Sequence, residues 1–237
     1  MFHYMLTPLH EHFDLGFGSV ANSFKHAADS IPHAPPENRG LNEHLPISFL
    51  YRHAIELYIK SAIIIFHKKL KLPYGEEPHT GEPYVLVGVK WKPMYQIHSL
   101  NDLYPYFRRL FVDYEDFLKQ NTNTNWEFSP KLDSWIFEIE EYDSTSTFFR
   151  YPITKHRDKD KEKSVIKPDS HLNIISRMGL GGKPQKAFFV LNEHDEVTQA
   201  FYHDDERPNS MIDILRNVCN QLHGCHAALR GELTGGW

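Results

Sequence analysis

Apolar residues recur at helical spacing along most of this chain, and residues 46–72 show the pattern most clearly. Apolar positions three and four apart line one face of that segment, and adjacent apolar positions widen the face over much of the circumference. A helix with so much apolar surface is buried against several partners. Pro46 suits the first turn, where its missing N–H costs nothing, and Pro73 and Gly75 predict the end.

Four further segments carry the same periodicity. We predict helices over residues 18–30, 98–119, 130–147 and 210–233. Asn209 or Ser210 is expected to cap the last of them. Helices joined by short polar connections pack as an up-and-down bundle. We therefore predict a mainly α fold, a bundle of four or five helices, within one domain over residues 1–237.

Two segments depart from this pattern and are expected to be insertions with β-hairpin character, over residues 73–97 and 153–209. Residues 84–89 are rich in β-branched side chains and predict a short strand. Residues 186–191 and 197–202 predict the two strands of a hairpin, with its turn at the residues between them.

The second insertion opens with a run of mixed charges at residues 155–163. Such a run is usually solvated, because it carries no apolar surface that burial would stabilise. We expect this run to be exposed and mobile.

The net charge and the lengths of the apolar runs limit which partners the chain can bind. The chain has 26 basic and 31 acidic residues and a net charge of −5, so any contact with nucleic acid must be a local site. No apolar run approaches the ~18 residues of a membrane span, and the first residues lack the pattern of a secretory signal. We therefore expect no membrane partner.

The cysteines and histidines indicate the cellular compartment of the chain and whether it binds a metal. Cys219 and Cys225 lie six apart in one predicted helix, which excludes an unstrained disulfide within it and favours a reducing, cytoplasmic location. The 16 histidines are scattered, and neither a paired-cysteine spacing nor an H-E-x-x-H motif is present. We expect neither a metal nor another cofactor.

A first charged cluster lies within residues 46–72. Arg52, Glu56 and Lys60 are spaced four apart and share one face, with His53 beside them, so they can form an ion-pair ladder. One interpretation is a solvated stripe. The other is a crevice in which these charges pair with groups from other helices, because so much of the circumference is apolar. We predict that Glu56 is paired with a cation.

A second cluster lies on the last predicted helix and comprises Arg216, Asn217, Asn220 and His223. Arg216 and His223 are seven apart, about 20° from eclipsed, and so lie two turns apart on one face. An arginine that binds phosphate and a histidine that moves a proton suit cleavage of an RNA phosphodiester, whose 2′-hydroxyl supplies the nucleophile without a metal. The alternative is an ordinary exposed arginine and histidine.

Two further residues are candidates for a polar pocket. His98 is expected to open a helix, and Arg150 follows another predicted helix within Phe-Arg-Tyr-Pro. Arg150 either joins an anion pocket with the first cluster or caps the carbonyls of the preceding helix end. His98 has the same two interpretations.

Taken in order, these pieces resemble the HEPN superfamily (higher eukaryotes and prokaryotes nucleotide-binding domain). The resemblance rests on residues 52–60 (RHAIELYIK), 98–103 (HSLNDL) and 150–152 (RYP), and on the Arg, polar residue and His within 216–223. It implies a helical bundle that dimerises, with the Arg/His pairs of two protomers meeting in a cleft. It further implies metal-independent RNA cleavage of the ribonuclease-like members, which act as toxins or antiviral defence effectors.

Two hypotheses about function follow. In the first, the chain is a homodimeric endoribonuclease in which Arg216 stabilises the phosphate, His223 is the general acid or base and Asn217 orients one of them. In the second, it is a non-catalytic HEPN-like module that binds a nucleotide or a partner. The pocket of that module consists of Arg52, His53, Glu56, Lys60, His98 and Arg150. RNA or a nucleotide is the expected ligand, and an antitoxin or regulatory protein a further partner.

Overall fold

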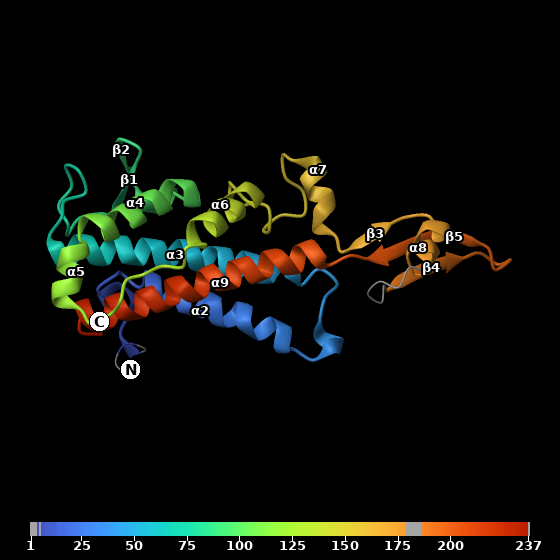
Figure 1. Cartoon of the computed structure of the whole chain (residues 1–237), viewed down its shortest axis with the longest axis horizontal. Coiled ribbons are helices and arrows are strands. Elements are labelled where there is room, and N and C mark those ends of the chain that lie inside the picture. The colour runs from blue at the N-terminus through green and yellow to red at the C-terminus, as the bar shows by residue number, and fades with distance from the viewer. Residues whose placement is uncertain (1–3, 5, 179–185, 237) are drawn as a thin grey trace.

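In the computed structural model, which describes residues 4, 6–178 and 186–236, the chain is mainly helical with a few short strands. The long helix α3 (His44–Leu70) lies at the centre, and other helices flank it on both sides (Figure 1). The flanking helices are α2 (Phe17–Ser30), α4 (Leu100–Asp113), α6 (Leu132–Tyr142) and α9 (Glu206–Ala228). Short 3-10 turns cover Leu9–Glu11, Ile31–His33, Pro36–Asn38 and Met94–Gln96.

The helix α3 owes its central place to the apolar surface around it. Every residue from Ser61 to His67 is buried, so neighbouring helices and the segment that carries Tyr74 and Trp91 cover all faces of the helix there. Lys71 ends the helix in the left-handed conformation, with φ 55°. The predicted segment 46–72 is therefore confirmed, although the helix begins and ends two residues earlier than expected.

The segment predicted as one helix over 98–119 forms two helices. Ser99, not His98, precedes the first turn of α4, and its hydroxyl accepts a 3.3 Å hydrogen bond from the Asp102 N–H. The chain leaves the helical conformation at Tyr114 (φ −116°, ψ 24°) before α5 (Glu115–Asn121) begins.

The end of α6 and the start of α9 differ from the prediction because of local hydrogen bonds and a proline. α6 ends at Tyr142 because the Asp143 carboxylate accepts the N–H groups of Thr147 (2.7 Å) and Phe148 (2.9 Å) and holds them in a turn. α9 begins at Glu206, so the prediction of Asn209 or Ser210 as its cap is wrong. Pro208 fits the first turn, where no N–H is needed. After Ala228 the chain continues as a single π-turn (Leu229–Leu233).

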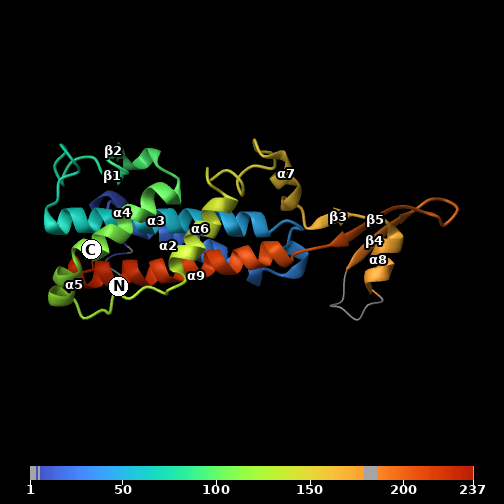
Figure 2. The same cartoon turned by 45° about the horizontal axis from the view of Figure 1, so that its top comes forward.

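The two expected insertions do contain β structure. β1 (Tyr84–Val87) and β2 (Lys90–Pro93) form a hairpin. β3 (Ile166–Pro168), β4 (Ala187–Leu191) and β5 (Val197–His203) form an antiparallel sheet in the order β3-β5-β4. The helix α8 (His171–Met178) packs on this sheet, and the two together form an arm that extends beyond the end of the helices (Figures 1 and 2). The predicted hairpin is confirmed.

The charged run 155–163 folds into α7 (Arg157–Asp160) and a 3-10 turn (Lys161–Lys163). The expectation that solvent surrounds the whole run is wrong at Lys163, which is buried. Its Nζ lies 2.6 Å from Asp160 Oδ1 and donates to the Tyr151 carbonyl at 2.7 Å, while its own carbonyl contacts the His44 ring at 2.8 Å. The contact between the Lys163 carbonyl and His44 fastens the run to the start of α3.

Candidate functional site

A buried ionic network surrounds Glu56 on α3. Lys60 Nζ donates a 2.7 Å hydrogen bond to Glu56 Oε1, and the His98 ring nitrogen Nδ1 lies 3.0 Å from the same oxygen. Arg52 Nη1 faces the other carboxylate oxygen at 3.6 Å. The prediction that Glu56 is paired with a cation is confirmed, and the solvated-stripe interpretation is wrong for all three members of the ladder.

Arg52 also joins the network to two other helices. Its Nη2 donates a 2.7 Å hydrogen bond to the His98 carbonyl and lies 3.6 Å from Glu140 Oε2 on α6. Glu140 in turn accepts from the Ser99 hydroxyl (2.7 Å) and from the Leu100 N–H (2.9 Å) at the N-terminus of α4. Two carboxylates thus balance two cations where α3, α4 and α6 meet.

The pKa directions follow from this burial. Burial alone would raise the pKa of Glu56, but the charge and hydrogen bond of Lys60, followed by the charge of Arg52, lower it below its usual value. Burial raises the pKa of Glu140 and lowers that of Arg52. Within this network Glu56 is therefore the carboxylate held most firmly in the ionised form.

The six residues predicted for a polar pocket are only partly brought together. Arg52, Glu56, Lys60 and His98 belong to the network, and the His98 side chain is half exposed. His53 instead packs between Phe24 (4.5 Å) and Phe49 (5.9 Å), and Arg150 lies over the Phe49 ring at 5.2 Å. Burial lowers the pKa of His53. These two form an aromatic stack beside the network rather than a part of it.

Arg216 on α9 is held by neighbours that the sequence did not indicate. Its Nη1 lies 2.8 Å from Asp213 Oδ1, and its Nε donates to the Tyr51 hydroxyl at 3.3 Å. The Tyr51 hydroxyl donates a 2.5 Å hydrogen bond to Asp29 on α2, and Asp29 pairs with Lys25 at 2.7 Å. Burial and the Asp29 contact raise the pKa of Tyr51 to about 12. Arg216 thus faces the junction of α2, α3 and α9.

His223 belongs to the same junction. Its ring is exposed and lies edge-on to Tyr58 at 5.9 Å. Partial burial, followed by the charges of Lys25 and His26, lowers the pKa of His223. Arg216 and His223 thus each contact a tyrosine of α3, Tyr51 and Tyr58, and the charge of Asp29 on α2 acts to raise the pKa of both side chains.

Asn217 does not join them. Among the described residues it makes no hydrogen bond to Arg216 or His223. It lines a separate hollow with His203 and Arg177, between the first half of α9 and the sheet. The predicted role of Asn217 in orienting either residue therefore has no support in this geometry.

A third polar group, not found from the sequence, lies between the N-terminal segment, α3 and α9. The Ser61 hydroxyl donates to Asp14 Oδ2 at 2.5 Å and lies 3.0 Å from His226 Nδ1, and all three side chains are buried. Asp14 also accepts the N–H groups of Gly16 (3.0 Å) and Gly18 (2.8 Å). The residue types match a hydrolytic triad, but no substrate can reach a fully buried serine. The group instead anchors the N-terminal segment to the core.

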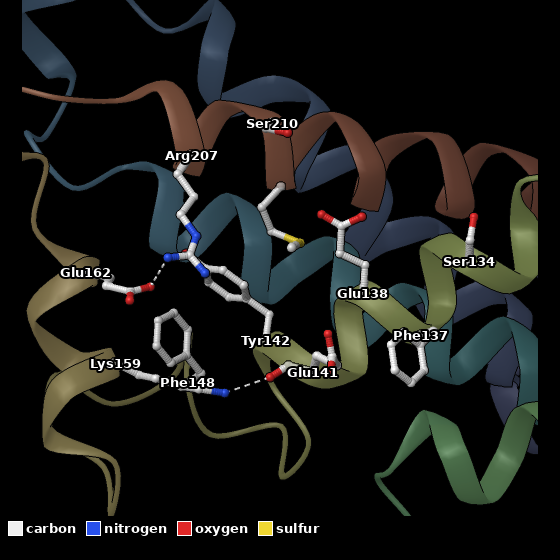
Figure 3. A pocket seen from close by; sticks show the side chains of 11 residues that line it. Ser134, Phe137, Glu138, Glu141, Tyr142, Phe148, Lys159, Glu162, Arg207 and Ser210 are labelled. Atoms are coloured by element: carbon white, nitrogen blue, oxygen red, sulfur yellow. Dashed lines mark hydrogen bonds and ion pairs between the residues drawn. The ribbon is translucent and has the colours of Figure 1, made fainter.

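A hollow of about 620 Å³ opens between α6, the 155–163 run and α9 (Figure 3). Its two cations are already engaged, because Arg207 pairs with Glu162 at 2.6 Å and Lys159 donates to the Glu141 carbonyl at 2.8 Å. The carboxylates of Glu138 and Glu141 also line it, beside apolar and hydroxyl side chains such as Phe137, Met211 and Ser210. The hollow therefore does not suit a phosphate, and it contains none of the predicted site residues.

No group of three or more His, Cys, Asp or Glu side chains within the described residues is arranged to hold a metal ion. The described helices include none with the length and apolar character to cross a membrane. Cys219 and Cys225 are buried free thiols. Comparison of the chain with protein-family models, with curated proteins and with solved structures finds no match.

Proposed function

We propose that this chain is a metal-independent endoribonuclease whose site lies at the junction of α2, α3 and α9. The observation that carries the proposal is that Arg216 and His223 each contact a tyrosine of α3, Tyr51 at 3.3 Å and Tyr58 at 5.9 Å, from partly accessible positions on α9. The resemblance of the motifs to the HEPN superfamily supplies the reaction class. The proposal includes a HEPN-like bundle fold, a dimer through α9 and a cytoplasmic location.

The chemistry assigns each residue a separate task. The RNA 2′-hydroxyl loses its proton and attacks the adjacent phosphorus, and the 5′-oxygen leaves with a proton, giving a 2′,3′-cyclic phosphate and a 5′-hydroxyl. His223, whose pKa is lowered, is neutral at pH 7, so it can accept the 2′-hydroxyl proton and then, as an imidazolium, donate it to the departing 5′-oxygen. Arg216 binds the phosphate oxygens as negative charge develops on them.

The spacing of the pair favours a composite site. Seven residues of helix separate Arg216 from His223 by about 10 Å along the axis, which is long for joint contact with one phosphate. In a twofold dimer through α9, the Arg216 of one protomer and the His223 of the other can approach the same phosphate. A toxin or an antiviral defence effector is the biological role that we propose for such an enzyme.

A non-catalytic module is the second candidate, and one observation favours it. Arg216 already pairs with Asp213 and Tyr51, so a phosphate has to compete with Asp213 for the guanidinium. In that case the exposed His98 edge of the ionic network is the place where a nucleotide or partner protein binds.

The deciding experiment incubates the purified chain with RNA in the presence of a chelator. We expect fragments that end in a cyclic phosphate, and no cleavage of a substrate with 2′-deoxyribose at the cut site. Arg216→Ala and His223→Ala should each abolish cleavage. Arg207→Ala and His194→Ala change the same residue types at exposed places elsewhere and should leave cleavage unchanged. Cleavage that survives both site substitutions would overturn the assignment, and absence of cleavage would favour the binding module.

A further inference from the structure

One edge of the arm's sheet is an apolar strand, β4, whose outer side pairs with no other described strand. β4 forms one edge of the sheet, because the strand order is β3-β5-β4. Phe188, Phe189, Val190 and Leu191 on this strand are each between 40% and 52% exposed. Natural proteins usually protect such an edge with charges, proline or a covering loop, because a bare apolar edge pairs with other chains. An edge with apolar side chains on both faces marks an interaction surface.

The backbone groups at this edge alternate in direction. The Lys186 carbonyl accepts a 2.9 Å hydrogen bond from the His203 N–H, so the backbone groups of Lys186 point toward β5. By alternation those of Phe188 and Val190 do the same. The N–H and C=O groups of Ala187, Phe189 and Leu191 therefore point outward, away from β5. These three residues are symmetric about Phe189.

We propose that β4 pairs antiparallel with β4 of a second copy of this chain, about a twofold axis at Phe189. In this register the Phe189 residues of the two copies lie opposite each other, and each Ala187 lies opposite Leu191 of the other copy. Every outward N–H and C=O group of these three residues then has a partner. The two three-stranded sheets become one sheet of six strands.

The side chains fit the same register. Cross-strand neighbours in an antiparallel pair lie on one face, so Phe188 of each copy contacts Val190 of the other. The two Phe189 side chains meet on the opposite face. The helix α8 covers that face, because its Arg177 lies 4.4 Å from the ring of Tyr202, the β5 partner of Ala187. The exposed Leu172 and Ile175 of α8 extend the apolar surface there.

Charges at the two ends of β4 favour a second copy of this chain as the partner and an antiparallel direction for its β4. Lys186 precedes the strand, and the turn that follows it carries Glu193, Asp195 and Glu196, all of them exposed. Antiparallel pairing places Lys186 of each copy beside the acidic turn of the other, at both ends of the new pair. A parallel partner copy would set like charges side by side. The apolar surface is small, so we expect association at micromolar concentration rather than a permanent dimer.

Sedimentation velocity of the full chain, from about 1 to about 500 µM, tests the proposal. We expect an association step through the arm, separate from the dimer through α9, that Leu191→Lys weakens by at least about tenfold. Val112→Lys, which adds the same charge at an exposed valine on α4, should leave the equilibrium unchanged. Lys186→Glu and Glu193→Lys should each weaken the dimer, and the double variant should restore it. Sedimentation that is the same for the parent chain and the Leu191→Lys variant over the whole range would overturn the proposal, because association through α9 does not involve β4.

Cysteine variants test the register itself. Phe188→Cys mixed with Val190→Cys should form a disulfide-linked heterodimer under mild oxidation, whereas either variant alone should link poorly. The native thiols Cys219 and Cys225 are buried and give little background. Equal linking in all three samples would contradict the predicted register.

Discussion

Lys60 donates a hydrogen bond of 2.7 Å to Glu56, and Lys119 lies at the same 2.7 Å from Glu115 on α5. Both pairs have the i, i+4 spacing. The first is almost completely buried, with side-chain exposures of 3% and 1%, while the second is exposed at 64% and 63%. The two pairs share a distance and a spacing, but only the Glu56 carboxylate is buried and also faces Arg52 and His98.

We expect Glu56→Ala to lower the free energy of unfolding by about 3–5 kcal/mol, because it leaves Lys60 and Arg52 buried without their carboxylate. Glu115→Ala should change it little, since water solvates the lysine that remains. Urea denaturation of both variants at pH 7 makes the comparison. Similar midpoints for the two variants would contradict the buried network.

Stability should fall in mild acid through His226. Burial lowers the pKa of this histidine from its usual 6.5 to about 4. The unfolded chain therefore binds a proton before the folded one, so the stabilisation is complete above pH 6.5 and is lost as the pH falls toward 4. This one group accounts for a loss of about 2 kcal/mol at pH 5.

Urea denaturation between pH 7.5 and pH 5 measures this loss. His226→Gln should flatten the pH dependence relative to the parent chain, whereas His194→Gln, a change at an exposed histidine in the β4–β5 turn, should not. An unchanged slope in the His226 variant would show that the histidine does not titrate as described.

Gly18→Ala should destabilise the fold by about 1–3 kcal/mol or more. A Cβ atom at this position would lie 2.0 Å from Cε1 of the His226 ring, and hydrogen-bonding neighbours hold that ring in place. Gly224→Ala on α9 has open space around it and should stabilise the helix by about 0.5–1 kcal/mol. Thermal unfolding of the two variants should therefore shift in opposite directions, and a shift in the same direction would argue against the close contact.

Limited trypsin digestion should separate the lysines of the charged run. Lys159 and Lys161 are exposed and should be cut early, whereas Lys163 is buried against Asp160 and should be resistant. Asp160→Asn should make Lys163 susceptible, because it removes the charge that holds the ammonium group. Mass spectrometry of the first fragments identifies the sites. Early cleavage after Lys163 in the parent chain would contradict its burial.

The periodicity of apolar residues predicted the helices and the β4–β5 hairpin well, because burial of one face governs both patterns. It did not predict where helices end. The end of α6 depends on the Asp143 carboxylate capturing two N–H groups, and the start of α9 depends on Pro208 being tolerated in a first turn. Such local hydrogen bonds and steric effects leave almost no trace in the spacing of apolar residues along the sequence.

The sequence predicted the ion pairs within α3 but not the contacts that join them to other helices. The spacing of Arg52, Glu56 and Lys60 is visible in one helix, whereas Glu140 lies 80 or more positions away and joins them only through tertiary packing. The Ser61 and His226 contact spans 165 positions and was not predicted for the same reason. The interpretation that Arg52, Glu56 and Lys60 lie in a crevice rather than in solvent was based on the wide apolar surface of the helix, and the structure confirms it.

The connection between β5 and α9 is only two residues long, Asp204 and Asp205, and the Asp204 N–H is fixed to the Val165 carbonyl at 2.8 Å. Two residues span at most about 7 Å and offer little slack. We therefore expect the arm and the first turn of α9 to move together as one unit. A partner that tilts the sheet would then also shift the start of α9, the helix that carries Arg216 and His223.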